Sequence, residues 1–237
     1  MKTFRLKISD KVVVLTGAGV SAESGLKTFR DNNGLWEKNR VEDVATPEAF
    51  QRDPAMVWSF YKQRYWQLDE VQPNQTHIAL VELEKYLDYF RLITQNVDGL
   101  HKSAGNKNIW EMHGTLDKAC CSKCNSKFAM NVLDLEQEIP ICPVCGASAR
   151  PDIIWFGEMP YFMDEIHSAL QEADYFIMIG TSGMVYPAAQ FIQIAKHYGA
   201  KTVCVNLEKP ENNYFADYFY QGKSGEILPK LVAEWIK

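Results

Sequence analysis

Two closely spaced cysteine pairs, Cys121-x-x-Cys124 and Cys142-x-x-Cys145, carry the clearest metal chemistry in the sequence. Each pair can chelate one ion, and the spacer between the pairs has a length found in four-cysteine zinc sites. Four thiolates complete the tetrahedral shell of zinc and leave no position open for water. The sequence therefore predicts one structural zinc ion rather than a catalytic one.

The other two cysteines are expected to lie outside this zinc site. Cys120 could pair with Cys124 instead, but a C-x-x-x-C spacing is less usual for a zinc knuckle, and Cys204 is expected in the core. Met1–Asp10 lacks the apolar stretch of a signal peptide, so we expect a cytoplasmic protein with reduced thiols. Reduced thiols favour metal binding over disulfides.

A glycine-containing turn, Gly17–Ser21, follows the apolar run Lys11–Thr16 directly. Glycines at the end of a buried strand let the backbone approach a pyrophosphate and expose N–H groups to its charge. The third glycine of the usual dinucleotide fingerprint is absent, so an ordinary dehydrogenase fits poorly. A purely structural turn is the alternative interpretation.

Two further polar segments follow predicted strands. Thr94–His101 reads TQNVDGLH and is either a ligand site or a capped turn, because Asn, Asp and Gly all favour turns. His113 precedes a glycine at another strand end. The near-neutral intrinsic pKa of histidine makes this residue a competent general base, although a lone histidine is more often structural.

Together these segments resemble the sirtuins, the NAD-dependent protein deacylases. The similar segments are Gly17–Arg30, Gly34–Trp36, Thr94–His101 and the His113-Gly114 pair, and they follow the family's order. The resemblance extends over nearly the whole chain. Lys27 differs from the family, which usually has proline at that position.

The resemblance implies that NAD is consumed as a co-substrate and that nicotinamide, free lysine and O-acyl-ADP-ribose are released. It gives catalytic roles to His113, as the base for the ribose hydroxyls, and to Asn96, which with Asp98 binds the nicotinamide carboxamide. The implied cofactor-binding residues are Gly17, Ala18, Gly19, Ser21, Ala22, Glu23, Phe29, Arg30, Trp36, Gln95, Asn96, Asp98, Gly180, Thr181, Ser182, Asn206, Leu207, Glu208 and Ser224. Without the resemblance, the alternative interpretation of Gly180–Ser182 and of Asn206–Glu208 is a turn that begins a helix.

A helical insertion carries residues that could select the acyl group. Tyr61 and Arg64 are three residues apart and so share a helix face, where a guanidinium and a phenol could bind a carboxylate while small Ala45 leaves room. These residues resemble the class III sirtuins, which implies that succinyl-lysine and malonyl-lysine are accepted as well as acetyl-lysine. The alternative is a surface arginine paired with Asp69 or Glu70.

Acylated lysines of protein substrates are the implied partners. The peptide is expected to add as a strand between two segments, with little sequence preference, near Trp155, Phe156, Gly157, Glu158, Met184 and Val185. Two other functions stay open on the sequence: a mono-ADP-ribosyltransferase, and a non-catalytic NAD sensor with a zinc-ribbon interaction module.

The elements that position these residues alternate between strands and helices. The expected strands are Lys11–Thr16, Tyr89–Thr94, Tyr175–Gly180 and Lys201–Leu207, all apolar runs typical of a buried parallel sheet. The expected helices are a pair beginning after Thr46 and Asp53, one near Thr76 and a closing one over Gly225–Lys237. This alternation predicts an α/β fold with a doubly wound, Rossmann-like parallel sheet and a smaller zinc-binding and helical module.

One catalytic domain of 237 residues is expected to contain both parts. The larger part covers about 1–39, 76–118 and 149–237, and the smaller part consists of the helical insertion 40–75 and the zinc module 119–148. The net charge of −5 provides no basic surface for nucleic acid, and no apolar run is long enough to cross a membrane. We therefore expect neither partner, and we expect a monomer.

Overall fold

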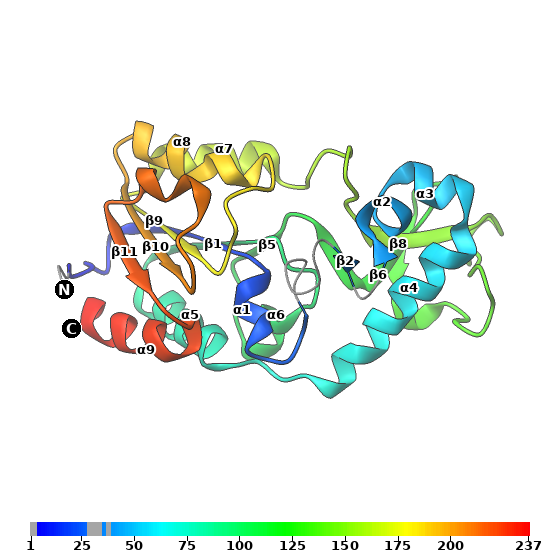
Figure 1. The fold of residues 1–237 in the computed structure, drawn as a ribbon, viewed down its shortest axis with the longest axis horizontal. Helices are drawn as coiled ribbons and strands as arrows, with labels where there is room; N and C mark the ends of the chain where they lie inside the picture. Colours follow the sequence, from blue (N-terminus) through cyan, green and yellow to red (C-terminus); the bar gives the residue numbers. More distant parts are fainter. Residues whose placement is uncertain (1–3, 28–34, 37–38) are drawn as a thin grey trace.

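The chain forms an elongated α/β structure with a parallel sheet in its larger part and a small antiparallel sheet at the opposite end (Figure 1). This computed structural model describes residues 4–27, 35–36 and 39–237, without the side chains of residues 35, 36 and 39. The C-terminal end lies on the side of the larger part that faces away from the smaller one (Figure 1).

A six-stranded parallel sheet is the centre of the larger part. In sheet order its strands are β11 (Tyr218–Gln221), β10 (Lys201–Asn206), β9 (Tyr175–Ile179), β1 (Lys11–Thr16), β4 (Tyr89–Thr94) and β5 (Ile109–Glu111). Thr16 at the end of β1 lies beside Thr94 on one side and Ile179 on the other. The carboxyl ends of the strands therefore meet at one edge, and the predicted doubly wound sheet is confirmed.

Helices cover both faces of this sheet (Figure 1). One face is covered by α5 (Gln75–Tyr86) and α9 (Ser224–Trp235), and the other by α7 (Met163–Glu172) and α8 (Phe191–His197). Successive residues of β1 point to opposite faces, so Val12 and Val14 pack with Leu80 while Val13 and Leu15 pack with Ile166. Among the described residues, no helix has the length and apolar character needed to span a bilayer.

The predicted helices after Thr46 and Asp53 are present as α3 (Pro47–Arg52) and α4 (Pro54–Gln67). Both capping side chains act as expected, because Thr46 Oγ1 accepts from Ala49 N–H at 3.1 Å and Asp53 Oδ1 accepts from Met56 N–H at 2.9 Å. The insertion also contains a short helix that the sequence did not predict, α2 (Val41–Val44), whose start has no side-chain cap.

The smaller part combines these helices with a three-stranded antiparallel sheet in the order β7 (Lys127–Ala129), β6 (Gly114–Cys121) and β8 (Ala149–Ile153). Helix α4 packs on this sheet through Trp58, whose indole N–H donates to the Ala149 carbonyl at 2.9 Å. This sheet includes residues on both sides of the expected zinc module 119–148, because β6 begins at Gly114 and β8 ends at Ile153. The shorter elements are α1 (Ala18–Ala22), α6 (Leu100–Ala104), β2 (Leu35–Trp36), β3 (Asn39–Arg40) and the 3-10 helices η1 (Leu68–Glu70), η2 (Met130–Val132), η3 (Ala188–Gln190) and η4 (Glu211–Phe215).

Four thiols form a compact cluster beside the small sheet. The Sγ atoms all lie within 4.8 Å of one another and belong to Cys121, Cys124, Cys142 and Cys145. Four thiolates this close together fit one tetrahedral zinc ion, as the spacing predicts. Cys120 does not belong to this cluster, and Cys204 is fully buried in the core of the larger part, where burial raises the pKa of its thiol to about 12.

Replacing one zinc ligand should unfold the small sheet. We expect about one zinc ion per chain in the wild type and almost none in Cys142→Ser, together with a lower unfolding temperature, because binding of the ion contributes to folding free energy. Metal analysis and thermal unfolding measure both effects. Cys120→Ser is the matched control and should keep its zinc, and a zinc-free wild type would contradict the assignment.

Candidate functional site

Polar side chains gather where β1 and β4 end. The side-chain amide of Asn96 donates to the carbonyl of Gly17 at 3.1 Å and lies 3.0 Å from Ser21 Oγ. The Ser21 hydroxyl in turn donates to Asp98 Oδ2 at 2.6 Å. The glycine turn and the TQNVDGLH segment, which are far apart in the sequence, are thus brought together in one hydrogen-bonded group.

Asp98 is half-buried within this group. Burial raises the pKa of its carboxyl, whereas hydrogen bonds from the Ser21 hydroxyl and from the Leu100 N–H at 2.9 Å lower it. Gly99, between Asp98 and Leu100, has a left-handed φ of 71° and is the N-cap residue of α6. Each carboxylate oxygen of Asp98 accepts a hydrogen bond, so the orientation of the side chain is fixed. A carboxylate held in this way is suited to binding a polar ligand.

The glycines of the turn allow β1 and β9 to end in close contact. A Cβ atom on Gly17 or Gly19 would lie 2.8 Å from the Gly180 carbonyl oxygen, and one on Gly180, whose φ is 61°, would lie 2.6 Å from Val20 N. None of these three positions accepts a side chain without backbone movement. Close packing alone therefore explains these glycines.

The next two strand ends are tied to the same edge through Thr181. Its hydroxyl accepts a hydrogen bond from the Gln95 side chain at 3.1 Å, and its carbonyl accepts one from the Asn206 side chain at 2.8 Å. Leu207 and Glu208 follow Asn206 and are exposed, and Ser182 is half-buried. Gly180 and Thr181 thus lie beside the glycine turn, and Asn206 is joined to them through Thr181.

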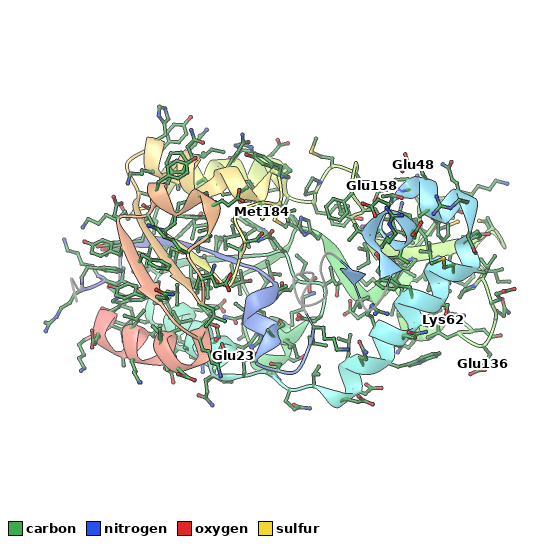
Figure 2. All side chains as sticks on the ribbon, viewed as in Figure 1. Glu23, Glu48, Lys62, Glu136, Glu158 and Met184 are labelled. Atoms are coloured by element: carbon green, nitrogen blue, oxygen red, sulfur yellow. The ribbon has the colours of Figure 1, made fainter. Side chains whose placement is uncertain are left out.

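Glu23 joins the far end of the glycine turn to the closing helix. Its Oε1 accepts hydrogen bonds from the Ser224 hydroxyl and from the Gly225 N–H, both at 2.9 Å. Thr76 Oγ1, from α5, donates to Ser224 Oγ at 2.8 Å. In Figure 2, Glu23 lies between α1 and the start of α9, so the structure brings this predicted pair together.

His113 lies in the turn between β5 and β6, close to the TQNVDGLH segment. Its Nδ1 is 3.1 Å from the carbonyl oxygen of Gln95, which can only accept a hydrogen bond. Nδ1 therefore carries the proton, and the lone pair is on Nε2. Burial lowers the pKa of His113, and the Gln95 carbonyl partly opposes that shift, so the ring is suited to act as a neutral base.

Tyr61 and Arg64 are both buried on α4, which contradicts the alternative interpretation of Arg64 as a surface residue. The Arg64 guanidinium lies 3.6 Å from the centre of the Phe60 ring and donates to the Phe60 carbonyl at 2.7 Å. Tyr61 packs in the same core cluster as Ala45 and Trp155. A cation, a phenol and a small residue are thus placed in one region of the smaller part.

The segment expected to receive the peptide follows β8. The Phe156 N–H donates to the Ala45 carbonyl at 3.0 Å, and the Phe156 side chain is exposed. Both oxygens of Glu158 accept hydrogen bonds from Arg150, at 2.7 and 2.8 Å, so its carboxylate holds this segment in place. Figure 2 shows Glu158 and Met184 on opposite sides of the junction between the two parts.

Gly157 has a left-handed φ of 93°, and Val185 is half-buried beside exposed Met184. Phe29 and Arg30 lie outside the described residues, and Trp36 belongs to β2 without a described side chain. Arg150 was not predicted as a site residue from the sequence. Its contacts with Glu158 and Trp155 arise from the fold of the chain around β8 and have no local sequence signal.

The relatives of the chain share this architecture. A model of the Sir2 family matches residues 17–187. An NAD-dependent protein deacylase from Bdellovibrio bacteriovorus is 49% identical over 237 residues, which cover 98% of this chain and 99% of the relative.

Two solved structures agree over most of their length. A Sir2 homologue–NAD complex has a TM-score of 0.88 at 41% identity and covers 95% of this chain and 89% of its own. A mutant Sir2 homologue in complex with 2′-O-acetyl ADP ribose has the same TM-score and identity and covers 95% of this chain and 91% of its own. The chain described here therefore belongs to the Sir2 family.

Proposed function

We propose that this Sir2 family member is an NAD-dependent protein-lysine deacylase that releases nicotinamide, O-acyl-ADP-ribose and free lysine. The observation that carries the proposal is the hydrogen-bonded group of Ser21, Asn96 and Asp98, with His113 held beside it by Gln95. A relative named as an NAD-dependent protein deacylase and a homologue with bound 2′-O-acetyl ADP ribose support the same chemistry.

In this proposal the site residues have separate roles. When NAD is bound, it supplies an electrophilic ribose carbon with nicotinamide as the leaving group. Asn96 and Asp98 hold the carboxamide, and they are oriented for this role by Ser21 and the Gly17 carbonyl. Nε2 of His113 would serve as the base for the ribose hydroxyls, while Nδ1 donates to the Gln95 carbonyl. Much of the rate comes from holding the acyl oxygen close to the ribose carbon.

The other cofactor contacts follow the same edge of the sheet. Gly17–Glu23 would face the phosphates, and the turns at Thr181 and Asn206, with Ser224, would hold the ribose and adenine. The sheet edge supports this arrangement, because Thr181 is bonded to both Gln95 and Asn206. The protein substrate would lie between Phe156–Glu158 and Met184–Val185 as an added strand.

The smaller part is proposed to bind acidic acyl groups. A succinyl or malonyl chain would extend toward Tyr61 and Arg64, whose burial allows a charge-assisted hydrogen bond to be strong. Acetyl-lysine would be accepted at the same site. We further propose a cytoplasmic monomer that binds neither nucleic acid nor a membrane, in line with the net charge of −5.

Removing the proposed base should abolish most turnover. His113→Ala should lower kcat/KM for deacylation about 100-fold or more, because a positioned base contributes on the order of 100- to 10,000-fold. Nicotinamide release and peptide deacylation are both measured. His167→Ala, which changes an exposed histidine on α7, is the matched control, and equal activity of the two variants would contradict the role of His113.

The pH profile should reflect the partly buried environment of His113. Because burial lowers its pKa below the usual 6.5, the neutral base should persist to lower pH than for a free histidine. The acidic limb of kcat/KM should therefore have its midpoint below pH 6.5. An acidic limb that lies above this value in wild type would argue against His113 as the titrating base.

Arg64→Met tests the acyl preference. Loss of a charge-assisted hydrogen bond of roughly 1.5 to 3 kcal/mol should reduce desuccinylation about ten- to one-hundred-fold, with a much smaller effect on deacetylation. Matched succinyl and acetyl peptides are compared in the same preparation. Arg52→Met, at an exposed arginine in the same helical insertion, is the control. Equal losses with both peptides would refute the selectivity.

A further inference from the structure

The Tyr61 hydroxyl is oriented by a residue from outside its own helix. Tyr61 is fully buried on α4, and its oxygen lies 3.0 Å from the indole nitrogen of Trp155, which follows β8. An indole N–H can donate but not accept, so the tyrosine oxygen is the acceptor in this hydrogen bond. The hydroxyl proton of Tyr61 must therefore point away from Trp155.

Trp155 is in turn held firmly in place. The Arg150 guanidinium carbon lies 3.6 Å from the centre of a Trp155 ring, and Arg150 forms a bidentate ion pair with Glu158 at 2.7 and 2.8 Å. Glu158 also accepts a hydrogen bond from the Trp155 backbone N–H at 2.8 Å. The stacked guanidinium and the doubly bound carboxylate leave Trp155 2% exposed, with little freedom to rotate.

Two positive charges and one negative charge act on Tyr61. Burial raises the pKa of Tyr61 well above its ordinary value. The hydrogen bond with Trp155 and the positive charges of Arg150 and Arg64 partly oppose that shift, and the negative charge of Glu158 adds to it. Tyr61 therefore keeps its proton at neutral pH and can act as a hydrogen-bond donor. A phenol donor and the guanidinium of Arg64 are groups that can both donate hydrogen bonds to a carboxylate.

We infer that Trp155 is a positioning residue for acidic acyl groups, because its indole N–H directs the Tyr61 hydroxyl proton toward the carboxylate of the acyl chain. The inference rests on the proposed function, since it takes Tyr61 and Arg64 as the residues that receive this carboxylate. An acetyl group has no carboxylate. The contact should therefore change the ratio of desuccinylation to deacetylation and not simply the overall rate.

Trp155→Phe tests the inference, because phenylalanine keeps an aromatic ring for Arg150 to stack on but removes the N–H donor. One neutral hydrogen bond is worth roughly 0.5 to 1.5 kcal/mol, so the succinyl-to-acetyl ratio of kcat/KM should fall roughly 3- to 10-fold. Both peptides are measured in the same preparation. A partly unfolded fraction then cancels from the ratio, so the test stays valid even if the variant is less stable.

A double-mutant cycle with Tyr61→Phe separates positioning from general packing. We expect Trp155→Phe to lower the ratio in the wild-type background and to leave it unchanged in the Tyr61→Phe background, where no hydroxyl remains to be oriented. An unchanged ratio in the wild-type background, or an equal fall in both backgrounds, would overturn the inference.

Arg64→Met distinguishes a failure of this inference from a failure of the proposed function. If Arg64→Met lowers the ratio and Trp155→Phe does not, only the role of Trp155 is wrong. If the wild type does not remove succinyl groups, or if Arg64→Met leaves the ratio unchanged, the proposed acyl preference is wrong and the inference falls with it.

Discussion

The side-chain amide of Asn96 joins the ends of two neighbouring parallel strands, and the other groups of the candidate site are arranged around this contact. Asn96 follows β4, and its side-chain amide donates to the Gly17 carbonyl and lies 3.0 Å from Ser21 Oγ, both in the segment after β1. The Ser21 hydroxyl in turn donates to Asp98. Such a contact depends on parallel pairing, because only then do both strands end at the same edge. The orientation of the groups that are proposed to bind nicotinamide is thus a consequence of the sheet.

The smaller part contributes a second constraint that is independent of the first. The packing of α4 on the small sheet places Trp155 against Tyr61, and Arg150 and Glu158 in turn hold Trp155. Residues from α4 and from the segment after β8 meet only because this module is folded. In the proposed function the larger part supplies the reaction, while the smaller part selects the acyl chain.

Much of this arrangement is predictable from the sequence, because its signals are local. The capping residues Thr46 and Asp53 mark two helices, and two C-x-x-C pairs mark the zinc cluster. Helix α2 was not predicted, because four residues without a side-chain cap produce no periodic pattern. The chain of contacts from Glu158 to Tyr61 was also missed, since residues 61 and 155 are brought together only by the packing of α4 on the small sheet.

The most direct test of the account is a product analysis by mass spectrometry, with NAD and an acylated-lysine peptide as the substrates of the wild-type protein. The account predicts nicotinamide, O-acyl-ADP-ribose and free-lysine peptide in equal amounts, with no nicotinamide released when the acyl group is absent. Release of nicotinamide with ADP-ribose attached to the peptide would contradict it in favour of a mono-ADP-ribosyltransferase. Binding of NAD without any turnover would contradict it in favour of a sensor.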